Sequence, residues 1–314
     1  MNEEIRNYIG EEPLGCCFSD ISGRDFWKAI LGSYWHVDEI DETLELPAVQ
    51  GVLLHGPYGS GKNTLLQAMA GEMVQGGYRY LEMDFQKIPK TKAAMVFDEI
   101  KRDYLGTQPI FLFLNRLDLF ENASLLWEFY HAADETGYPV ILAGAVENET
   151  DIAPDIRKLF HSYWIDVPDR MDRKAFFVEN LESLFEHASI QGMEKLLDGT
   201  EGYNYIQMES LVNQLKLRVK YTVLKEGKTL ELAMAWLEVD FIEEALERSK
   251  QPKMENHGVS DVSAILQALS NIPAASAAQT KEAEQPNGKD PLEDLRAKYS
   301  PKKVFDQGLM FAKK

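Results

Sequence analysis

Residues 51–73, "GVLLHGPYGSGKNTLLQAMAGEM", decide the fold of this chain. An apolar run ends at Gly56, a glycine-rich turn follows, and apolar residues then return at helical spacing from Asn63 onward. This order predicts a strand, a loop and a helix, the arrangement in which backbone N–H groups at a helix start bind phosphate.

Each residue type in the turn suits phosphate binding. The glycines let backbone N–H groups curl around phosphate oxygens, and Lys62 reaches the outer phosphates. The next position usually carries the Ser or Thr hydroxyl that holds Mg²⁺, but here it is Asn63, and Thr64 lies about 100° further around the helix. The sequence therefore predicts a site for ATP or ADP, with Mg²⁺ doubtful and no metal ligand assigned. The candidate nucleotide-binding residues are Gly56, Pro57, Tyr58, Gly59, Ser60, Gly61, Lys62, Asn63 and Thr64.

The bulk composition excludes several classes of protein. With 45% hydrophobic and 27% charged residues, the 314-residue chain can fill one or two globular cores. No apolar run approaches the ~20 residues needed to cross a bilayer, and the acidic N-terminus does not resemble a signal peptide. The net charge of -18 disfavours a broad nucleic-acid surface. We expect a cytoplasmic protein with no membrane segment, two reduced thiols at Cys16 and Cys17, and protein rather than nucleic-acid partners.

The rest of the chain alternates apolar runs with helical patterns. Continuous apolar strands that alternate with helices predict an α/β fold, with a parallel sheet covered on both faces. The expected strands are 49–56, 78–85, 109–115 and 139–146, with helices at 92–105 and 123–137. From 169 to about 250 the pattern is helical, which predicts a helical lid after the sheet domain.

Charge and composition divide the chain into five parts. The predicted boundaries are an N-terminal segment 1–17, an α/β nucleotide-binding domain 18–168, a helical lid 169–250, a flexible linker 251–291 and a basic amphipathic tail 292–314. Within the linker, residues 270–291 have no aromatic residue and too little apolar surface to order themselves. The tail carries six Lys/Arg against three Asp/Glu, and is either a frayed terminus or a tethered docking peptide.

Phosphate hydrolysis needs a carboxylate pair at the end of a buried strand. The strand 109–115 has the right setting, but it ends in Asn115 and Arg116, and the nearby Asp118 is expected to cap a helix. "VFDE" at 96–99 supplies Asp98 and Glu99 in the wrong setting, because the surrounding apolar residues form a helical stripe. These are Ala93, Val96, Phe97, Ile100 and Tyr104.

Several motifs in order resemble one family, the AAA+ ATPases of the clade that includes katanin and spastin. The likeness covers about residues 18–250 and implies a P-loop sheet domain with a C-terminal helical lid. The motifs that carry it are "FSDISGRDFWKAIL" (18–31), "GPYGSGK" (56–62), "FLFLNRLD" (111–118), "GAVENETDIAPDIRKLF" (144–160), "EGYNYIQMESLV" (201–212) and "VDFIEEALERSK" (239–250).

The resemblance also implies which positions have lost their catalytic residues. The metal hydroxyl falls on Asn63, the metal carboxylate on Asn115, and the water-polarising glutamate on Arg116. The sensor asparagine near the terminal phosphate falls on Glu147, whose charge should repel that phosphate.

Positions that serve neighbouring subunits and substrate are altered as well. The two arginines offered to the neighbour fall on Lys158 and Leu159, or shift to Arg157. The pore aromatic falls near residues 88–90, with Phe85 the nearest aromatic.

These losses predict a pseudo-ATPase that acts as an assembly or regulatory subunit. The implied partner is a protein, for example an intact AAA+ subunit, in a homo- or hetero-oligomer. Two alternatives stay open: an active AAA+ ATPase with an atypical acidic pair, and a nucleotide-independent adaptor or chaperone-like module.

Overall fold

The computed structural model describes residues 3–35, 43–185, 190–227, 229, 242–243 and 245–247. All of them belong to one compact unit, Met1–Lys253. The predicted linker and basic tail, 251–314, lie outside the described residues.

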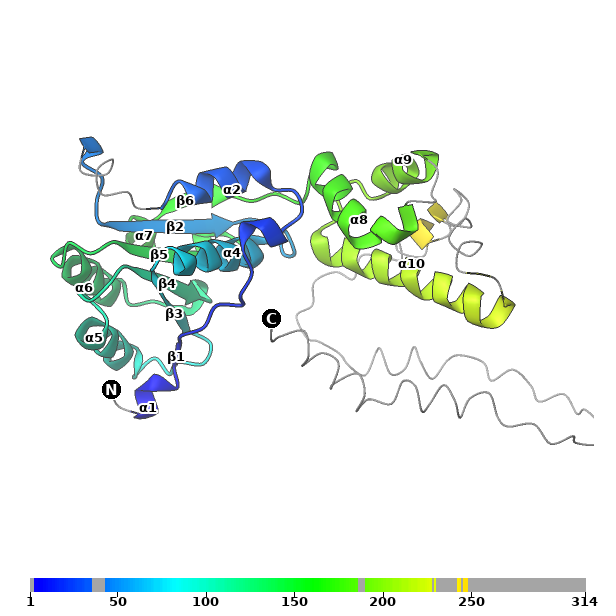
Figure 1. The fold of residues 1–314 in the computed structure, drawn as a ribbon. Helices are drawn as coiled ribbons and strands as arrows, with labels where there is room; N and C mark the ends of the chain where they lie inside the picture. Colours follow the sequence, from blue (N-terminus) through cyan, green and yellow to red (C-terminus); the bar gives the residue numbers. More distant parts are fainter. Residues whose placement is uncertain are drawn as a thin grey trace, which may run out of the picture. The chain divides into compact units, whose positions relative to one another are not determined.

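A six-stranded sheet forms the centre of the α/β part, in the order β1-β3-β4-β5-β2-β6 (Figure 1). Five strands are mutually parallel, which confirms the predicted parallel sheet. Neither β6 nor the two-residue β1 was predicted; β6 pairs parallel with β2, whereas β1 pairs antiparallel with β3 at the sheet edge. The strands are β1 (Ile9–Gly10), β2 (Val49–His55), β3 (Arg79–Asp84), β4 (Ile110–Asn115), β5 (Val140–Val146) and β6 (His161–Trp164).

Helices cover both faces of this sheet. One face packs against α2 and α4, and the other against α5 and α6. Along β4 the buried side chains alternate between these two layers: Phe111 and Phe113 face α4, whereas Leu112 and Leu114 face α5 and α6. The helical elements of this part are α1 (Glu3–Arg6), η1 (Phe18–Asp20), α2 (Asp25–Gly32), α4 (Lys62–Gln75), α5 (Ala93–Asp103), η2 (Leu117–Leu119), α6 (Ala123–Asp134), η3 (Glu149–Asp151) and α7 (Pro154–Arg157).

The N-terminal residues pack onto the same core. Ile5 and Ile9 are buried in the layer that contains α5. Tyr104, just after α5, donates a 3.0 Å hydrogen bond to Glu11. Residues 5–11 therefore contribute both apolar and polar contacts to the sheet edge.

The "VFDE" sequence lies in the middle of α5. All five residues of the predicted apolar stripe are buried. Asp98 and Glu99 form ion pairs with Lys101 and Arg102, one helical turn further on. This geometry confirms the helical interpretation.

The described part of the chain after β6 is helical, as the sequence predicts, and we call it the lid. Its helices α8 (Arg170–Phe185), α9 (Ile190–Gly199) and α10 (Tyr205–Glu226) enclose a separate apolar core around Phe177, Leu211 and Leu215. α10 begins with a reciprocal cap, in which the side chains of Asn204 and Gln207 each accept the other's backbone N–H at 2.9 Å.

None of the helices within the described residues is long and apolar enough to span a bilayer.

The α5 layer gives a direct test of the fold. Phe97 is fully buried, with ring centroids of Phe120 and Phe129 at 5.8 and 5.3 Å. Phe97→Ala should lower the free energy of unfolding by about 3–5 kcal/mol, because the cavity cannot collapse completely. Met95→Ala on the exposed face of the same helix, where Met95 is 49% exposed, should change it by less than about 0.5 kcal/mol. Urea unfolding followed by circular dichroism measures both; equal effects would contradict this placement of α5.

Candidate nucleotide site

The predicted phosphate-binding loop joins β2 to α4. Its glycines Gly56, Gly59 and Gly61 all have positive φ, at 145°, 75° and 91°. At Gly59 a Cβ atom would lie 2.8 Å from the side chain of Asn204 at the start of α10. The loop thus needs glycine both for its backbone conformation and for the close approach of the lid.

Lys62 folds back onto this loop. Its Nζ donates hydrogen bonds to the carbonyl oxygens of Gly56 and Pro57, both at 2.8 Å. The residue is only 8% exposed. Burial lowers the pKa of Lys62, and the negative charge of Glu147 opposes that shift. A phosphate entering the loop must therefore compete with carbonyl oxygens for this ammonium group.

Two adjoining cavities open beside the loop. The larger, of about 610 Å³, is lined by loop residues, by Glu147 at the end of β5 and by lid residues including Glu209. The smaller, of about 330 Å³, lies between residues 20–24, α4 and the lid helices. Gly61, Thr64 and Tyr205 line both. The shared lining places the two cavities side by side at the phosphate-binding loop.

The two residues that end β4 have different orientations. The Asn115 amide donates to Glu82 on the neighbouring strand at 3.1 Å. Arg116 has a left-handed backbone, with φ 57°, and lines the larger cavity. Its guanidinium donates two hydrogen bonds to Asp118, at 3.1 and 2.9 Å, and this carboxylate raises the pKa of Arg116.

The expectation that Asp118 caps a helix is wrong. The N-cap of η2 is Arg116, and Asp118 lies within the helix. Both of its carboxylate oxygens accept from Arg116, because the left-handed turn brings the two side chains together. Asp118 is therefore bound to a cation at the rim of the cavity.

Negative charge dominates the larger cavity. Its lining contains two cationic side chains, Lys62 and Arg116, and four carboxylates, Asp118, Glu147, Asp151 and Glu209. Such a lining opposes the charge of a triphosphate. Among the described residues, no group of three His, Cys, Asp or Glu side chains is placed to hold a metal ion.

Glu147 also connects the loop to the sheet, because its carbonyl oxygen accepts the Gly56 N–H at 3.0 Å. Asn63 and Thr64, at the start of α4, line the larger cavity together with Tyr58. Six of the nine predicted loop residues thus line one cavity with Arg116 and Glu147, Gly56, Pro57 and Ser60 are not in its lining, and Asn115 is directed to Glu82.

The two positions predicted to face a neighbouring subunit differ in exposure. Lys158 is on the surface and pairs with Asp155 at 2.7 Å. Leu159 is 6% exposed and belongs to the apolar core. An arginine at this second position would have to leave the core.

The predicted pore region likewise lacks an accessible aromatic ring. Phe85 is buried and stacks on Phe120, with ring centroids 4.6 Å apart. Ile88 is also buried, and Lys90 pairs with Glu121 on the surface.

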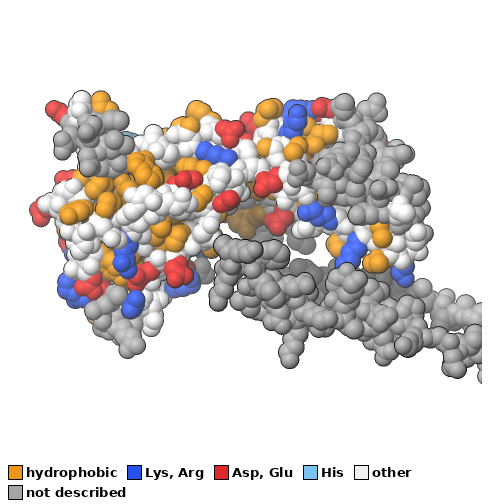
Figure 2. Space-filling view, viewed as in Figure 1, with side chains coloured by type: hydrophobic (Ala, Val, Ile, Leu, Met, Phe, Trp, Pro, Cys, Tyr) orange, Lys and Arg blue, Asp and Glu red, His pale blue; other side chains and the backbone are white. Residues whose placement is uncertain are grey.

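Acidic and basic side chains are mixed on the face of the molecule that Figure 2 shows, in its described part. On the described part of the face in Figure 2, acidic and basic side chains are interspersed with apolar ones. That part of the face has no broad basic patch.

Sequence reasoning missed three residues at the site. Asn204 donates from Nδ2 to the carbonyl of Tyr58 at 3.2 Å. The Tyr205 N–H donates to the carbonyl of Gly59 at 3.0 Å. Arg24 donates to the carbonyl of Ser60 at 2.9 Å. The motifs "FSDISGRDFWKAIL" and "EGYNYIQMESLV" contain these residues, but no local pattern connects them to the loop.

Known proteins are similar to this chain in sequence and in fold. No protein-family model matches the chain. A curated protein of Arabidopsis thaliana, the "Probable inactive ATP-dependent zinc metalloprotease FTSHI 4, chloroplastic", is 29% identical over 111 residues. The match covers 34% of this chain and 13% of the length of that protein.

A solved structure supplies the comparison of folds. A katanin structure from work on the structural basis for katanin self-assembly matches with a TM-score of 0.55 and 18% identity. The match covers 78% of this chain and 89% of the katanin chain. The chain therefore has an AAA+ ATPase fold similar to that of katanin, and about a third of it is similar in sequence to an FtsH-like protein named as probably inactive.

Proposed function

We propose that this chain is a nucleotide-binding AAA+ pseudo-ATPase that works as an assembly or regulatory subunit. The observation that carries the proposal is the end of β4, where the Arg116–Asp118 ion pair occupies the cavity wall and Asn115 donates to Glu82. Hydrolysis requires a metal and a carboxylate that polarises water at this place. The chain offers an amide and a cation instead.

Retention of nucleotide is supported by the adjoining cavities and the conformation of the loop. The glycine backbone conformation and Lys62 are the parts that bind phosphate in this fold. The four carboxylates of the larger cavity argue that this binding is weak, because a triphosphate without bound metal carries its full negative charge into an acidic site.

A role in assembly is supported by the comparisons. The curated relative is named as probably inactive, and the solved katanin structure concerns self-assembly. We therefore infer that the partner is an AAA+ subunit, either another copy of this chain or an intact relative that supplies catalysis to a mixed oligomer.

The metal dependence of binding tests the altered metal contacts. Isothermal titration should give a Kd for ATP in about the micromolar range or weaker. Adding Mg²⁺ should leave it almost unchanged, because Asn63 and Asn115 replace the hydroxyl and the carboxylate that hold the metal in this family. Lys62→Ala should abolish binding and provides the negative control. Tightening by Mg²⁺ of about tenfold or more would contradict this prediction.

Rebuilding the active site tests the lost hydrolysis. The variant Asn63→Thr, Asn115→Asp, Arg116→Glu should regain Mg²⁺-dependent ATP binding but release phosphate poorly when alone. The first reason is that a neighbouring copy offers Lys158 and Leu159 in place of the two arginines. A missing arginine of this kind lowers the rate of hydrolysis by about 10³–10⁵. The second is that Glu147 still lines the phosphate cavity.

Turnover should appear when the rebuilt variant is mixed with an AAA+ partner that has intact arginines, or when Lys158→Arg and Glu147→Asn are added. We leave out Leu159→Arg, because it would bury a charge in the core. Asp98→Asn and Glu99→Gln on α5 are the matched controls and should change nothing. Robust phosphate release by the unmodified protein, lost in either α5 variant, would overturn the proposal; absence of any nucleotide binding would favour an adaptor.

A further inference from the structure

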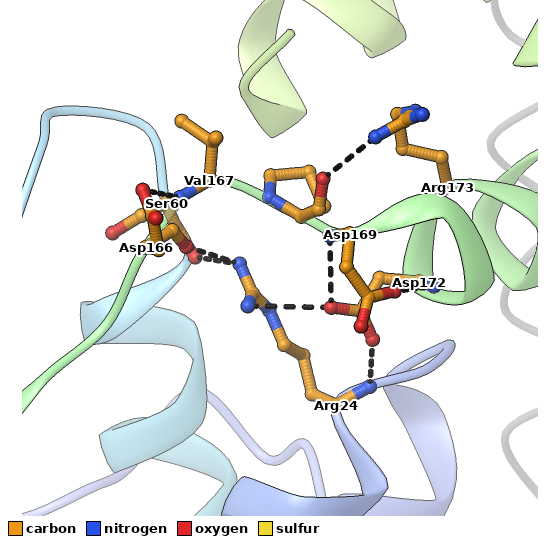
Figure 3. Close-up of polar contacts among 8 residues, drawn as sticks. Arg24, Ser60, Asp166, Val167, Asp169, Asp172 and Arg173 are labelled. Carbon is orange, nitrogen blue, oxygen red and sulfur yellow. Dashed lines mark hydrogen bonds and ion pairs between the residues drawn. The ribbon is translucent and has the colours of Figure 1, made fainter. Parts of the chain in front are cut away.

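Arg24 connects three separate segments of the chain (Figure 3). Its Nη2 donates to the carbonyl oxygen of Ser60 in the phosphate-binding loop at 2.9 Å, and to that of Asp166 after β6 at 2.7 Å. Its Nη1 lies 3.3 Å from Oδ2 of Asp172 in the first turn of α8. Arg24 is only 6% exposed, so these contacts are shielded from water.

The backbone at Gly23 and Arg24 also lies close to the start of α8. The Arg24 N–H donates to Oδ1 of Asp172 at 2.6 Å. A Cβ on Gly23 would lie 2.9 Å from the Cα of Asp172. Gly23 and Arg24 both have positive φ, at 68° and 61°. A left-handed non-glycine residue persists only where its surroundings determine the conformation strongly.

The lid side of this contact is held rigidly. Asp169 and Asp172 exchange side-chain-to-backbone hydrogen bonds at 2.8 and 3.3 Å, which caps α8. Arg173 bonds the carbonyl oxygens of Pro168 and Leu197 at 3.0 and 3.3 Å. A displacement of Asp172 should therefore move α8 and α9 together.

The contact between Arg24 and the phosphate-binding loop affects the N–H groups that could bind phosphate. Because a trans peptide places its C=O and N–H on opposite sides, the bond from Arg24 to the Ser60 carbonyl directs the Gly61 N–H away from Arg24. The guanidinium also lies 5.3 Å from the centre of the Tyr205 ring, and Tyr205 lines both cavities. Arg24 itself lines the smaller one.

A buried guanidinium is stable only when its partners are all in place. The desolvation of Arg24 and Asp172 is offset by their attraction and by the two carbonyl contacts, and removal of one partner leaves an uncompensated buried charge. The Arg24 Nε already lacks a partner. These contacts should therefore form or break together.

We propose that Arg24 and Asp172 form a clasp that holds the lid against the phosphate-binding loop without any ligand, and that they are positioning residues for the nucleotide site. This inference rests on the proposed nucleotide binding. In such a molecule the protein sets the lid position, so nucleotide binding and release change it little.

Hydrogen exchange of the full chain without ligand tests the clasp. Arg24→Met preserves the length of the side chain but removes its charge and its donors. It should speed amide exchange about tenfold or more in residues 57–62 and 166–176, and leave β4 unchanged. Asp172→Asn should act in the same direction. Arg24→Lys, whose ammonium cannot span three partners, should fall between Arg24→Met and the unmodified protein, and serves if Arg24→Met folds poorly.

Arg170→Met is the matched control. Arg170 also starts α8 and forms two ion pairs, but both partners, Glu194 and Asp198, lie within the lid. This variant should leave exchange at 57–62 unchanged. Exchange within about twofold of the unmodified protein in both Arg24 variants, or an equal rise in β4, would overturn the clasp.

Adding ADP separates the clasp from the function on which it rests. ADP should protect residues 166–176 strongly in Arg24→Met and only slightly in the unmodified protein, whose lid is already held. Equal protection of this segment in both would overturn the clasp. Failure of the unmodified protein to bind ADP by titration would overturn the proposed nucleotide site instead, and the exchange measured without ligand then decides the clasp.

Discussion

The close contact between the phosphate-binding loop and the lid is the constraint on which the site depends. The carbonyls of Tyr58 and Gly59 accept from Asn204 and Tyr205, and a side chain at Gly59 would collide with Asn204. Two backbones that approach this closely fix each other's conformation. The loop therefore holds its phosphate-binding shape because the lid is in place, and any contact that positions the lid also shapes the loop.

Charge then determines what the shaped loop can accept. Lys62 is already bonded to two carbonyl oxygens, and Arg116 is already bonded to Asp118. Both cations of the larger cavity are thus partly satisfied before any anion arrives, while Glu147 remains in the lining. A phosphate must break internal bonds to gain either cation. A bound metal would bring new positive charge into this cavity, so the loss of metal ligands that we propose would also weaken the binding of phosphate.

The sequence predicts the parts of this molecule that local pattern specifies. The glycine spacing predicted the loop, and the continuous apolar runs predicted four of the parallel strands. The apolar stripe at 93–104 predicted that α5 is a helix despite its acidic pair. β1 has only two residues, too few to show a period. The Arg24–Asp172 pair joins residues 148 positions apart, and nothing local signals such a contact. Asp118 was misread because the left-handed turn at Arg116 cannot be recognised from side-chain type alone.

The position of Leu159 explains how residues of such a site can be replaced without loss of the fold. The resemblance places there an arginine that would act on a neighbouring subunit, and such a residue contributes little to its own core. Leucine at this position is buried among apolar residues, where it adds stability to its own subunit. The apolar layers on both sides of the sheet and the separate lid core contain none of the other altered catalytic positions. The fold therefore does not depend on catalytic residues at these positions, and at Leu159 the leucine favours it, so the shape of the module would persist if its chemistry were lost, as we propose.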